Sequence, residues 1–352
     1  MAQTTELCRT ASVAHLPRVV AATRSPMAQA APLLPTPADF LLPPILHTES
    51  GAVRGVGVEI EFVGPTAESI AKRLSDALGG RVVQEDPHSF RLEDSSLGRI
   101  RVELDSRIVH PGKKPGLLGG VMPKIAAWFG SAASFLIPCE LVTSPIPMDR
   151  LHEADGLLQI LREAGARGTQ DAPLYAFGLH FNPEIPRSDA PSIIAILKAF
   201  VLLNAWLRRV VAPDTTRALL GFADPFPTEY ARLLVAPDYW PELPGFIDDY
   251  LAFNPTRNRD LDMLPLLLHL DEARVRAALP TEKINGRPAF HYRLPDARVS
   301  DPGWSVAPDW NRWVAVERLA SDRERLESVG LAFLAYEGEE KSWGDTVERI
   351  AF

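Results

Sequence analysis

Apolar and polar residues alternate most clearly in residues 53–63. A strand points successive side chains to opposite faces, so this alternation predicts a strand with two different faces. One face would carry Val56, Val58, Ile60 and Phe62, and the other would carry Gly57, Glu59 and Glu61. The turn sequence Gly64-Pro65-Thr66 then ends the pattern.

The spacing changes to that of a helix in residues 67–78, where Ile70, Leu74 and Leu78 recur on one side. Gly79 and Gly80 follow, and glycine at this place predicts the end of the helix. Short runs of alternating residues then predict strands at residues 81–84, 89–92 and 99–104.

The remainder of the chain mixes both patterns. Helical spacing predicts helices at residues 116–131, 148–164, 192–211 and 310–326, with short helices and proline-rich turns up to residue 279. Apolar runs predict strands at residues 135–142, 175–181 and 289–294. Because strands and helices do not alternate regularly, we expect an α+β fold. Its sheet would be mixed or antiparallel, with helices packed on one side.

The composition excludes some classes of protein. The chain has 352 residues, of which 46% are hydrophobic and 23% are charged, as is ordinary for a globular protein. Its net charge of -8 argues against a nucleic-acid partner, whose binding surface would be basic. The two cysteines, Cys8 and Cys139, lie too far apart in sequence to form a metal-binding pair and fit a reducing compartment.

The longest apolar stretch, around residues 193–207, is interrupted by Lys198 and Asn204. A membrane span needs roughly 18 or more apolar residues, so we expect no membrane partner and a cytoplasmic location. Residues 1–44 hold three arginines but only two acidic residues, with many alanines, threonines and prolines. Targeting peptides share this bias, but the apolar core of a secretory signal is missing.

We interpret residues 1–44 as a disordered extension or as the result of a start codon assigned too early, with Met27 as the true start. The catalytic domain is then expected at residues 45–352.

The first candidate site is the pair Glu59 and Glu61. Both side chains point to one face of the predicted strand, so their like charges repel unless a cation lies between them. Mg²⁺ prefers oxygen ligands of this kind. Gly57 on the same face leaves room for a ligand to approach. The alternative is a polar strand edge that faces water.

Two later strands offer further ligands. Glu140 interrupts an otherwise apolar run, and a buried lone carboxylate needs a partner. His180 and Asn182 share one face of their strand, where an imidazole and an amide can bind a metal or orient a phosphate. The alternatives are an edge glutamate in water and a histidine with a purely structural role.

Basic residues cluster near the last predicted strand. Lys283, Arg287 and Arg293 lie close together in sequence, and the guanidinium group matches the oxygens of phosphate and carboxylate. Solvated surface residues are the alternative.

A second polar segment, residues 254–262, contains Arg257 and Arg259, which are candidates for holding an anionic substrate. The alternative there is a helix cap formed by Asn258 or Asp260. The sequence has no G-x-x-x-x-G-K-[ST] loop, G-x-G-x-x-G fingerprint, H-E-x-x-H or G-x-S-x-G motif. A nucleotide would therefore be held through metal ions and arginines.

Three motifs, in this order, resemble the amidoligase family, which belongs with glutamine synthetase and gamma-glutamate–cysteine ligase among the carboxylate–amine ligases. The motifs are Gly57-Val58-Glu59-Ile60-Glu61-Phe62, Glu140-Leu141-Val142-Thr143-Ser144-Pro145 and Gly178-Leu179-His180-Phe181-Asn182. The resemblance spans residues 53–293, and the first motif is the most specific. It implies a curved, mainly antiparallel half-barrel like that of glutamine synthetase, with helices on the convex side and acidic residues on the concave face.

The resemblance also implies that Glu59, Glu61 and Glu140 bind magnesium or manganese ions bridging the phosphates of ATP, with His180 nearby. Relatives carry Glu-x-Arg in the last strand, whose Glu binds metal and whose Arg meets phosphate. This chain has His291-Tyr292-Arg293 there. Either His291 replaces the carboxylate as a metal ligand, or another acid fills its place, for which the candidates are Glu103, Asp94 and Asp105.

The resemblance predicts an ATP- and Mg²⁺-dependent ligase that joins a small-molecule or peptide carboxylate to an amine through an acyl phosphate. The candidate nucleotide-binding residues are Asn182, Lys283, Arg287 and Arg293, and the candidate catalytic residues are Arg257 and Arg293. The alternatives are a metal-dependent hydrolase that uses the same carboxylates, and a non-catalytic binding protein on the same scaffold. ATP consumption that depends on an added amine separates the ligase from both.

Overall fold

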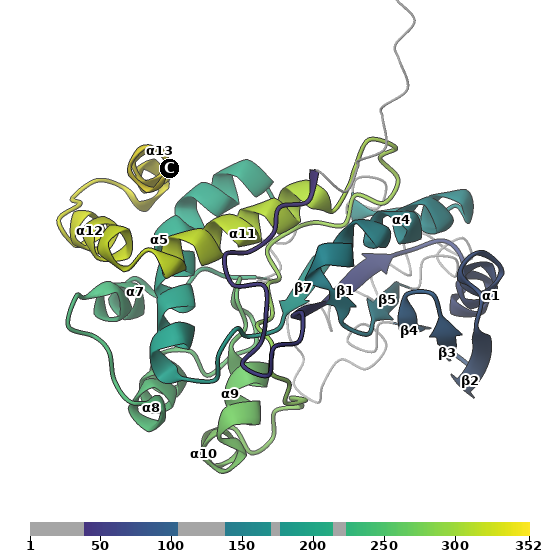
Figure 1. The fold of residues 1–352 in the computed structure, drawn as a ribbon, viewed down its shortest axis with the longest axis horizontal. Coiled ribbons are helices and arrows are strands. Elements are labelled where there is room, and N and C mark those ends of the chain that lie inside the picture. The colour runs from purple at the N-terminus through teal and green to yellow at the C-terminus, as the bar shows by residue number, and fades with distance from the viewer. Residues whose placement is uncertain (1–38, 105–137, 170–176, 214–222) are drawn as a thin grey trace, which may run out of the picture. The chain divides into compact units, whose positions relative to one another are not determined.

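The computed structural model describes residues 39–104, 138–169, 177–213 and 223–352 (Figure 1). The predictions for residues 1–38, for the helix at residues 116–131 and for Asp105 lie outside these described residues.

Seven strands form one antiparallel sheet. They are β1 (Gly55–Phe62), β2 (Arg81–Asp86), β3 (Ser89–Ser95), β4 (Gly98–Leu104), β5 (Cys139–Thr143), β6 (Ile146–Pro147) and β7 (Leu179–Pro183). Their order is β2-β3-β4-β5-β1-β6, and β7 also pairs with β1. Val56 pairs with both Ile146 and Pro183, so β6 and β7 lie on opposite edges of β1. The predicted α+β class is confirmed, and within the described ranges the sheet is open rather than closed.

The central strand β1 has the two faces that the sequence predicted. All eight of its residues are buried. Glu59 and Glu61 are only 8% and 7% exposed. Because β5 pairs with one edge of β1 and β7 with the other, the alternative of a polar strand edge facing water is wrong. The strand therefore carries two carboxylates into the interior, where each needs a partner.

Two helices cover the sheet on its apolar side (Figure 1). Helix α1 (Ala67–Leu78) has the predicted bounds and packs against β3, β4 and helix α4 (Ala154–Glu163). Thr66 caps α1, since its hydroxyl oxygen accepts a hydrogen bond from the backbone N–H of Ser69 at 3.2 Å. The predicted helix at residues 148–164 starts as a 3₁₀ helix, Met148–Glu153, and only then becomes α4.

The other helices lie beyond β7 (Figure 1). Helix α5 (Ala190–Val211) packs against α7 (Thr228–Val235), α11 (Ala307–Ser321), α12 (Arg323–Leu334) and α13 (Glu340–Ala351). Helix α10 (Glu272–Ala278) packs against α8 (Leu243–Phe253) and α9 (Leu264–Leu270). Helix α5 is long and apolar enough to cross a membrane by length and composition, but 78% of its most apolar window is buried inside the structure. This burial is typical of the core helix of a soluble protein.

Two further predicted elements differ from the observed ones. Residues 289–294 form no regular strand, because their backbone groups divide between two partners: Tyr292 N–H donates to Phe181 in β7, whereas Arg293 N–H donates to Asp260. The predicted last helix, residues 310–326, is two helices. Asp322 separates them and accepts a hydrogen bond from Arg325 N–H at 3.0 Å, which starts α12.

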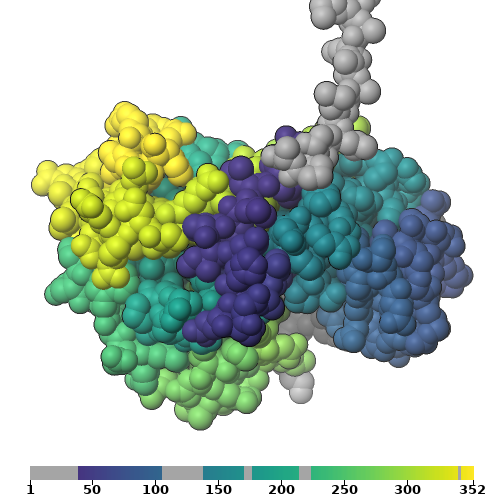
Figure 2. All heavy atoms as spheres, viewed as in Figure 1, coloured from purple at the N-terminus to yellow at the C-terminus, as the bar shows by residue number. Residues whose placement is uncertain are grey.

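A buried ion pair joins the sheet to the helical part. Arg54, just before β1, is fully buried and forms two contacts of 2.7 and 2.8 Å with the carboxylate of Glu317 in α11. Trp313 Nε1–H also donates to Glu317, at 2.7 Å. The segment before Arg54 crosses the surface against α11 (purple in Figure 2), where Trp310 donates to the carbonyl of Leu41 at 2.8 Å.

Candidate metal and nucleotide site

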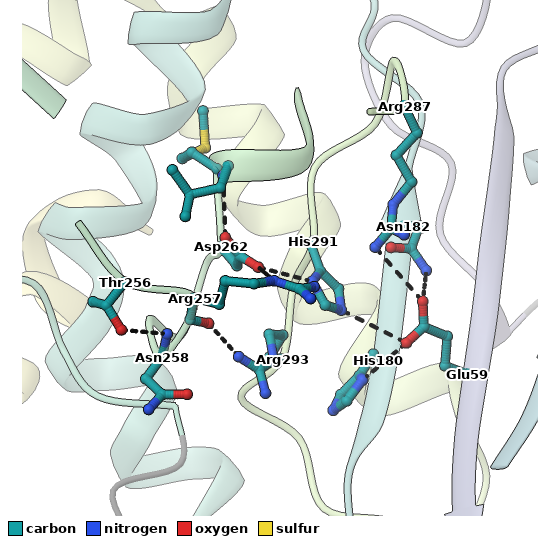
Figure 3. A network of polar contacts seen from close by, with 12 residues as sticks. Glu59, His180, Asn182, Thr256, Arg257, Asn258, Asp262, Arg287, His291 and Arg293 are labelled. Carbon is teal, nitrogen blue, oxygen red and sulfur yellow. Dashed lines mark hydrogen bonds and ion pairs between the residues drawn. The ribbon is translucent and has the colours of Figure 1, made fainter. Parts of the chain in front are cut away.

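Cross-strand pairing brings the predicted ligands together on one face of the sheet. Glu59 in β1 lies opposite His180 in β7, and Glu61 lies opposite Glu140 in β5. Directly opposed residues of an antiparallel pair have Cβ atoms about 4.5–5.5 Å apart. The sheet register therefore fixes these four side chains side by side, as Figure 3 shows for Glu59 and His180.

Glu59 is the centre of the polar network (Figure 3). Its Oε1 accepts a hydrogen bond from Asn182 Nδ2 at 2.7 Å, and its Oε2 lies 3.1 Å from His180 Nδ1. His291 Nε2 and Arg287 Nη2 approach the same carboxylate at 3.6 Å each. One buried carboxylate thus faces two imidazoles, an amide and a guanidinium.

Asn182 lies beside Gly57, where the sequence predicted room for a ligand. A Cβ at position 57 would lie 3.4 Å from both Cβ and Nδ2 of Asn182, which is an ordinary van der Waals contact. The side chain of Asn182 therefore occupies this space, from which it reaches Glu59.

Asp262 contacts His291 at Nδ1, whereas the other ring nitrogen, Nε2, faces Glu59. The carboxylate of Asp262 is fully buried, and its Oδ2 lies 3.4 Å from His291 Nδ1. Its Oδ1 accepts a hydrogen bond from Leu264 N–H at 3.1 Å, and Arg257 Nε–H donates to Oδ2 at 3.2 Å. Asp262, which the backbone of Leu264 holds in place, thereby orients the His291 ring. Figure 3 shows Asp262 beside His291.

A row of carboxylates continues across the sheet from Glu61. Glu140 pairs with Glu61 on one side and with Glu103 in β4 on the other, so three glutamates from three strands share this face. Glu61 Oε2 accepts a hydrogen bond from Gly178 N–H at 2.7 Å. Glu103 is half-buried and contacts Arg101 at 3.3 Å. The alternative of Glu140 as an edge residue is wrong, because β5 is paired on both sides.

The donor set fits divalent metal ions. Two groups of three residues bring ligand atoms within 4.8 Å of one another: Glu59, His180 and His291 form the inner cluster, and Glu61, Glu140 and His180 form the outer cluster. Carboxylate oxygens and imidazole nitrogens are ordinary ligands of such ions. His291 Nε2 is buried and has no hydrogen-bond partner among the described residues. A buried polar atom without a partner is unusual, and a bound metal ion would satisfy it.

The protonation states suit metal binding. Burial lowers the pKa of His180 to about 4, and the neighbouring carboxylates only partly offset this. Burial alone would raise the pKa of the Glu59 carboxyl, but the nearby His291 and the hydrogen bond with His180 outweigh it and hold that pKa well below its usual range. At neutral pH the site therefore presents a charged carboxylate and the neutral form of His180, which is the form that binds metals.

Comparison with known proteins decides the family. A family model described as "Putative amidoligase enzyme" matches residues 52–315, which is well over half of the chain and includes every candidate site residue. The chain belongs to this amidoligase family. The family indicates an enzyme that forms amide bonds. No curated protein and no solved structure matches the sequence.

The amidoligase site contains only part of the predicted basic cluster. Arg287 faces Glu59, and Arg293 is 4% exposed and donates to the backbone carbonyl of Arg257. Arg257 reaches the site indirectly, through Asp262. Lys283 is exposed, and the contact that connects it to the site is its backbone carbonyl, which accepts from Arg257 at 3.1 Å.

Arg259 has a structural role: it donates to Asn254 at 2.9 Å and to the carbonyl of Pro225 at 2.8 Å. Asp260 is no helix cap, because it is fully buried against Arg208 and Asn204. Asp94 is exposed near the end of β3, and β4 and β5 lie between β3 and β1, so it does not replace the missing carboxylate of the inner cluster.

Sequence reasoning gave Asp262 no role. It lies 29 residues from His291, and the only signal would have been a buried acid immediately before the apolar run of α9.

Proposed function

We propose that this member of the amidoligase family is an ATP- and Mg²⁺-dependent carbon–nitrogen ligase on a glutamine-synthetase-like half-barrel. The observation that supports it most is the convergence of Glu59, Glu61, Glu140, His180 and His291 into two adjoining metal clusters. Two ions beside arginine side chains are a recurrent arrangement for binding and polarising phosphates.

The residues divide into two roles. The inner and outer clusters hold the ions, which when bound neutralise charge on the phosphates of ATP. Arg287, whose Nε and Nη2 atoms are buried without hydrogen-bond partners among the described residues, and Arg293 bind phosphate oxygens. Asn182 orients Glu59, and Arg257 supports Asp262 and thereby His291.

The proposed reaction has two steps. A carboxylate oxygen of the acid attacks the γ-phosphorus of ATP, the bond to the ADP oxygen breaks, and an acyl phosphate forms. The amine nitrogen then attacks the acyl carbon, the bond to the phosphate oxygen breaks, and phosphate and the amine proton leave. The protein positions the reactants and stabilises the charge that develops on the transferred phosphoryl group.

The direct test is a screen of amino acids and other small carboxylic acids, each with and without amines, for phosphate release in the presence of ATP and Mg²⁺. The proposal expects release that requires both the acid and the amine. Release from ATP with neither would instead favour a hydrolase.

Replacing Arg287 with Ala is expected to raise the KM for ATP by about 10-fold to 100-fold, because the loss of a charge-assisted hydrogen bond costs about 1.5–3 kcal/mol. Steady-state kinetics at varied ATP concentration measures this. Arg73→Ala, an exposed arginine on α1, is the matched control and should leave the KM unchanged. An unchanged KM in Arg287→Ala would exclude Arg287 from the phosphate site.

A further inference from the structure

The inner cluster has the geometry of ligands around one ion. Glu59 Oε2 lies 3.1 Å from His180 Nδ1 and 3.6 Å from His291 Nε2. Two donors that are each about 2.1 Å from the same ion lie roughly 3.0–3.5 Å apart when the angle between them is between a right angle and a tetrahedral one. The two observed distances are close to this range without any movement of the chain.

The orientation of His291 suits a metal ligand. A protonated His291 paired with Glu59 would place Nε2–H within hydrogen-bond distance of the carboxylate, but 3.6 Å is too long for a hydrogen bond. Asp262 Oδ2, at 3.4 Å from Nδ1, favours a proton on Nδ1. Nε2 is then the ring atom that faces Glu59, and a carboxylate behind a metal-binding histidine is a recurrent arrangement.

The two clusters differ in their donors. The inner cluster offers two imidazoles and one carboxylate, whereas the outer cluster offers two carboxylates and shares His180. Mg²⁺ prefers oxygen, whereas imidazole nitrogens favour divalent transition-metal ions, and two histidines with one carboxylate are a known ligand set for them. To bind an ion through Nδ1, the neutral ring of His180 would carry its proton on Nε2, so the ion would replace the hydrogen bond to Glu59.

We propose that Glu59, His180 and His291 form a site selective for a divalent transition-metal ion such as Co²⁺ or Zn²⁺ over Mg²⁺, with Asp262 as its positioning residue. This inference rests on the metal site of the proposed function, but it concerns which ion the inner cluster holds and can be tested without ATP. The outer cluster keeps the carboxylate-rich set that suits Mg²⁺.

The test is a titration of the metal-free full chain with Co²⁺, followed by the visible absorption of the bound ion, and then by competition with Zn²⁺ and Mg²⁺. We expect Zn²⁺ to displace Co²⁺ at near-equal concentration, and Mg²⁺ to need at least about a 10-fold excess. Displacement by equimolar Mg²⁺ would overturn the selectivity.

Three variants locate the site. His291→Ala should abolish the Co²⁺ spectrum, and Asp262→Asn should weaken Co²⁺ binding by about 10-fold to 100-fold while circular dichroism shows an intact fold. His269→Ala, an exposed histidine in α9, is the control and should bind Co²⁺ as the unmodified chain does. An unchanged spectrum in His291→Ala would overturn the assignment.

His291→Glu keeps a ligand and tests the selectivity within a folded variant, since it creates an oxygen-rich inner cluster. We expect the ratio of Co²⁺ to Mg²⁺ affinity to fall by at least about 10-fold, and an unchanged ratio would contradict the proposal. Failure of the ligase assay together with selective Co²⁺ binding would count against the proposed function alone. Unselective binding together with ligase activity would count against this inference alone.

Discussion

Replacing Glu59 with Gln is expected to lower amine-dependent phosphate release by at least about 100-fold, a typical cost for removing one group that stabilises transition-state charge. Glutamine keeps the shape of the side chain but removes the negative charge. That charge lies between two imidazoles and a guanidinium, at 3.1–3.6 Å from each. The variant would lose the shared ligand of the inner cluster and the partner of Arg287 together.

The measurement is the initial rate of phosphate release at saturating ATP, with thermal unfolding to show that the variant is folded. Glu93→Gln is the matched control, because Glu93 is in β3 and is paired with Arg81 and Arg91 outside both clusters. It should retain the rate of the unmodified chain. A folded Glu59→Gln variant with full activity would remove Glu59 from the metal site.

Replacing Glu317 with Ala is expected to lower the free energy of unfolding by about 3–5 kcal/mol, because it leaves the buried guanidinium of Arg54 without its partner charge. Arg54 is 0% exposed, and its remaining hydrogen bonds go to the backbone carbonyls of Ile45 and Glu184. The contacts of Arg54 connect the segment before β1, the residue after β7 and α11. Loss of the Glu317 carboxylate would therefore destabilise both the sheet and the helical part.

Urea unfolding followed by circular dichroism measures this loss. Glu327→Ala removes an exposed ion pair with Arg323 on α12 and should cost less than about 1 kcal/mol. The double variant Arg54→Met/Glu317→Leu should recover much of the stability, since replacing both charges leaves neither one unpaired. Equal, small losses in Glu317→Ala and Glu327→Ala would contradict the role of the buried pair.

The local parts of the fold could be predicted from the sequence because their signals are local. The two-residue period of β1 correctly placed Glu59 and Glu61 on one face. The bounds of α1 were correct because Thr66 caps its start and Gly79, with a φ of 70°, ends it.

Some contacts between distant segments could not be predicted. Arg54 and Glu317 are 263 residues apart, and Asp262 and His291 are joined only when a loop folds beside β7. Periodicity reports which face a residue occupies, but not which other segment lies against it. The basic cluster shows the same limit: Arg287 turns toward Glu59, whereas Lys283, four residues earlier, is exposed.

The most direct test of the central claim uses an acid from the activity screen with ¹⁸O in its carboxylate group. The reaction is run with ATP, Mg²⁺ and the amine, and the released phosphate is analysed by mass spectrometry. The proposed mechanism predicts that each phosphate released carries one ¹⁸O from the acid, in equal number to the amides and ADP formed, because the acyl phosphate breaks between carbon and that oxygen. Phosphate without ¹⁸O, or formed at the same rate without the amine, would contradict it.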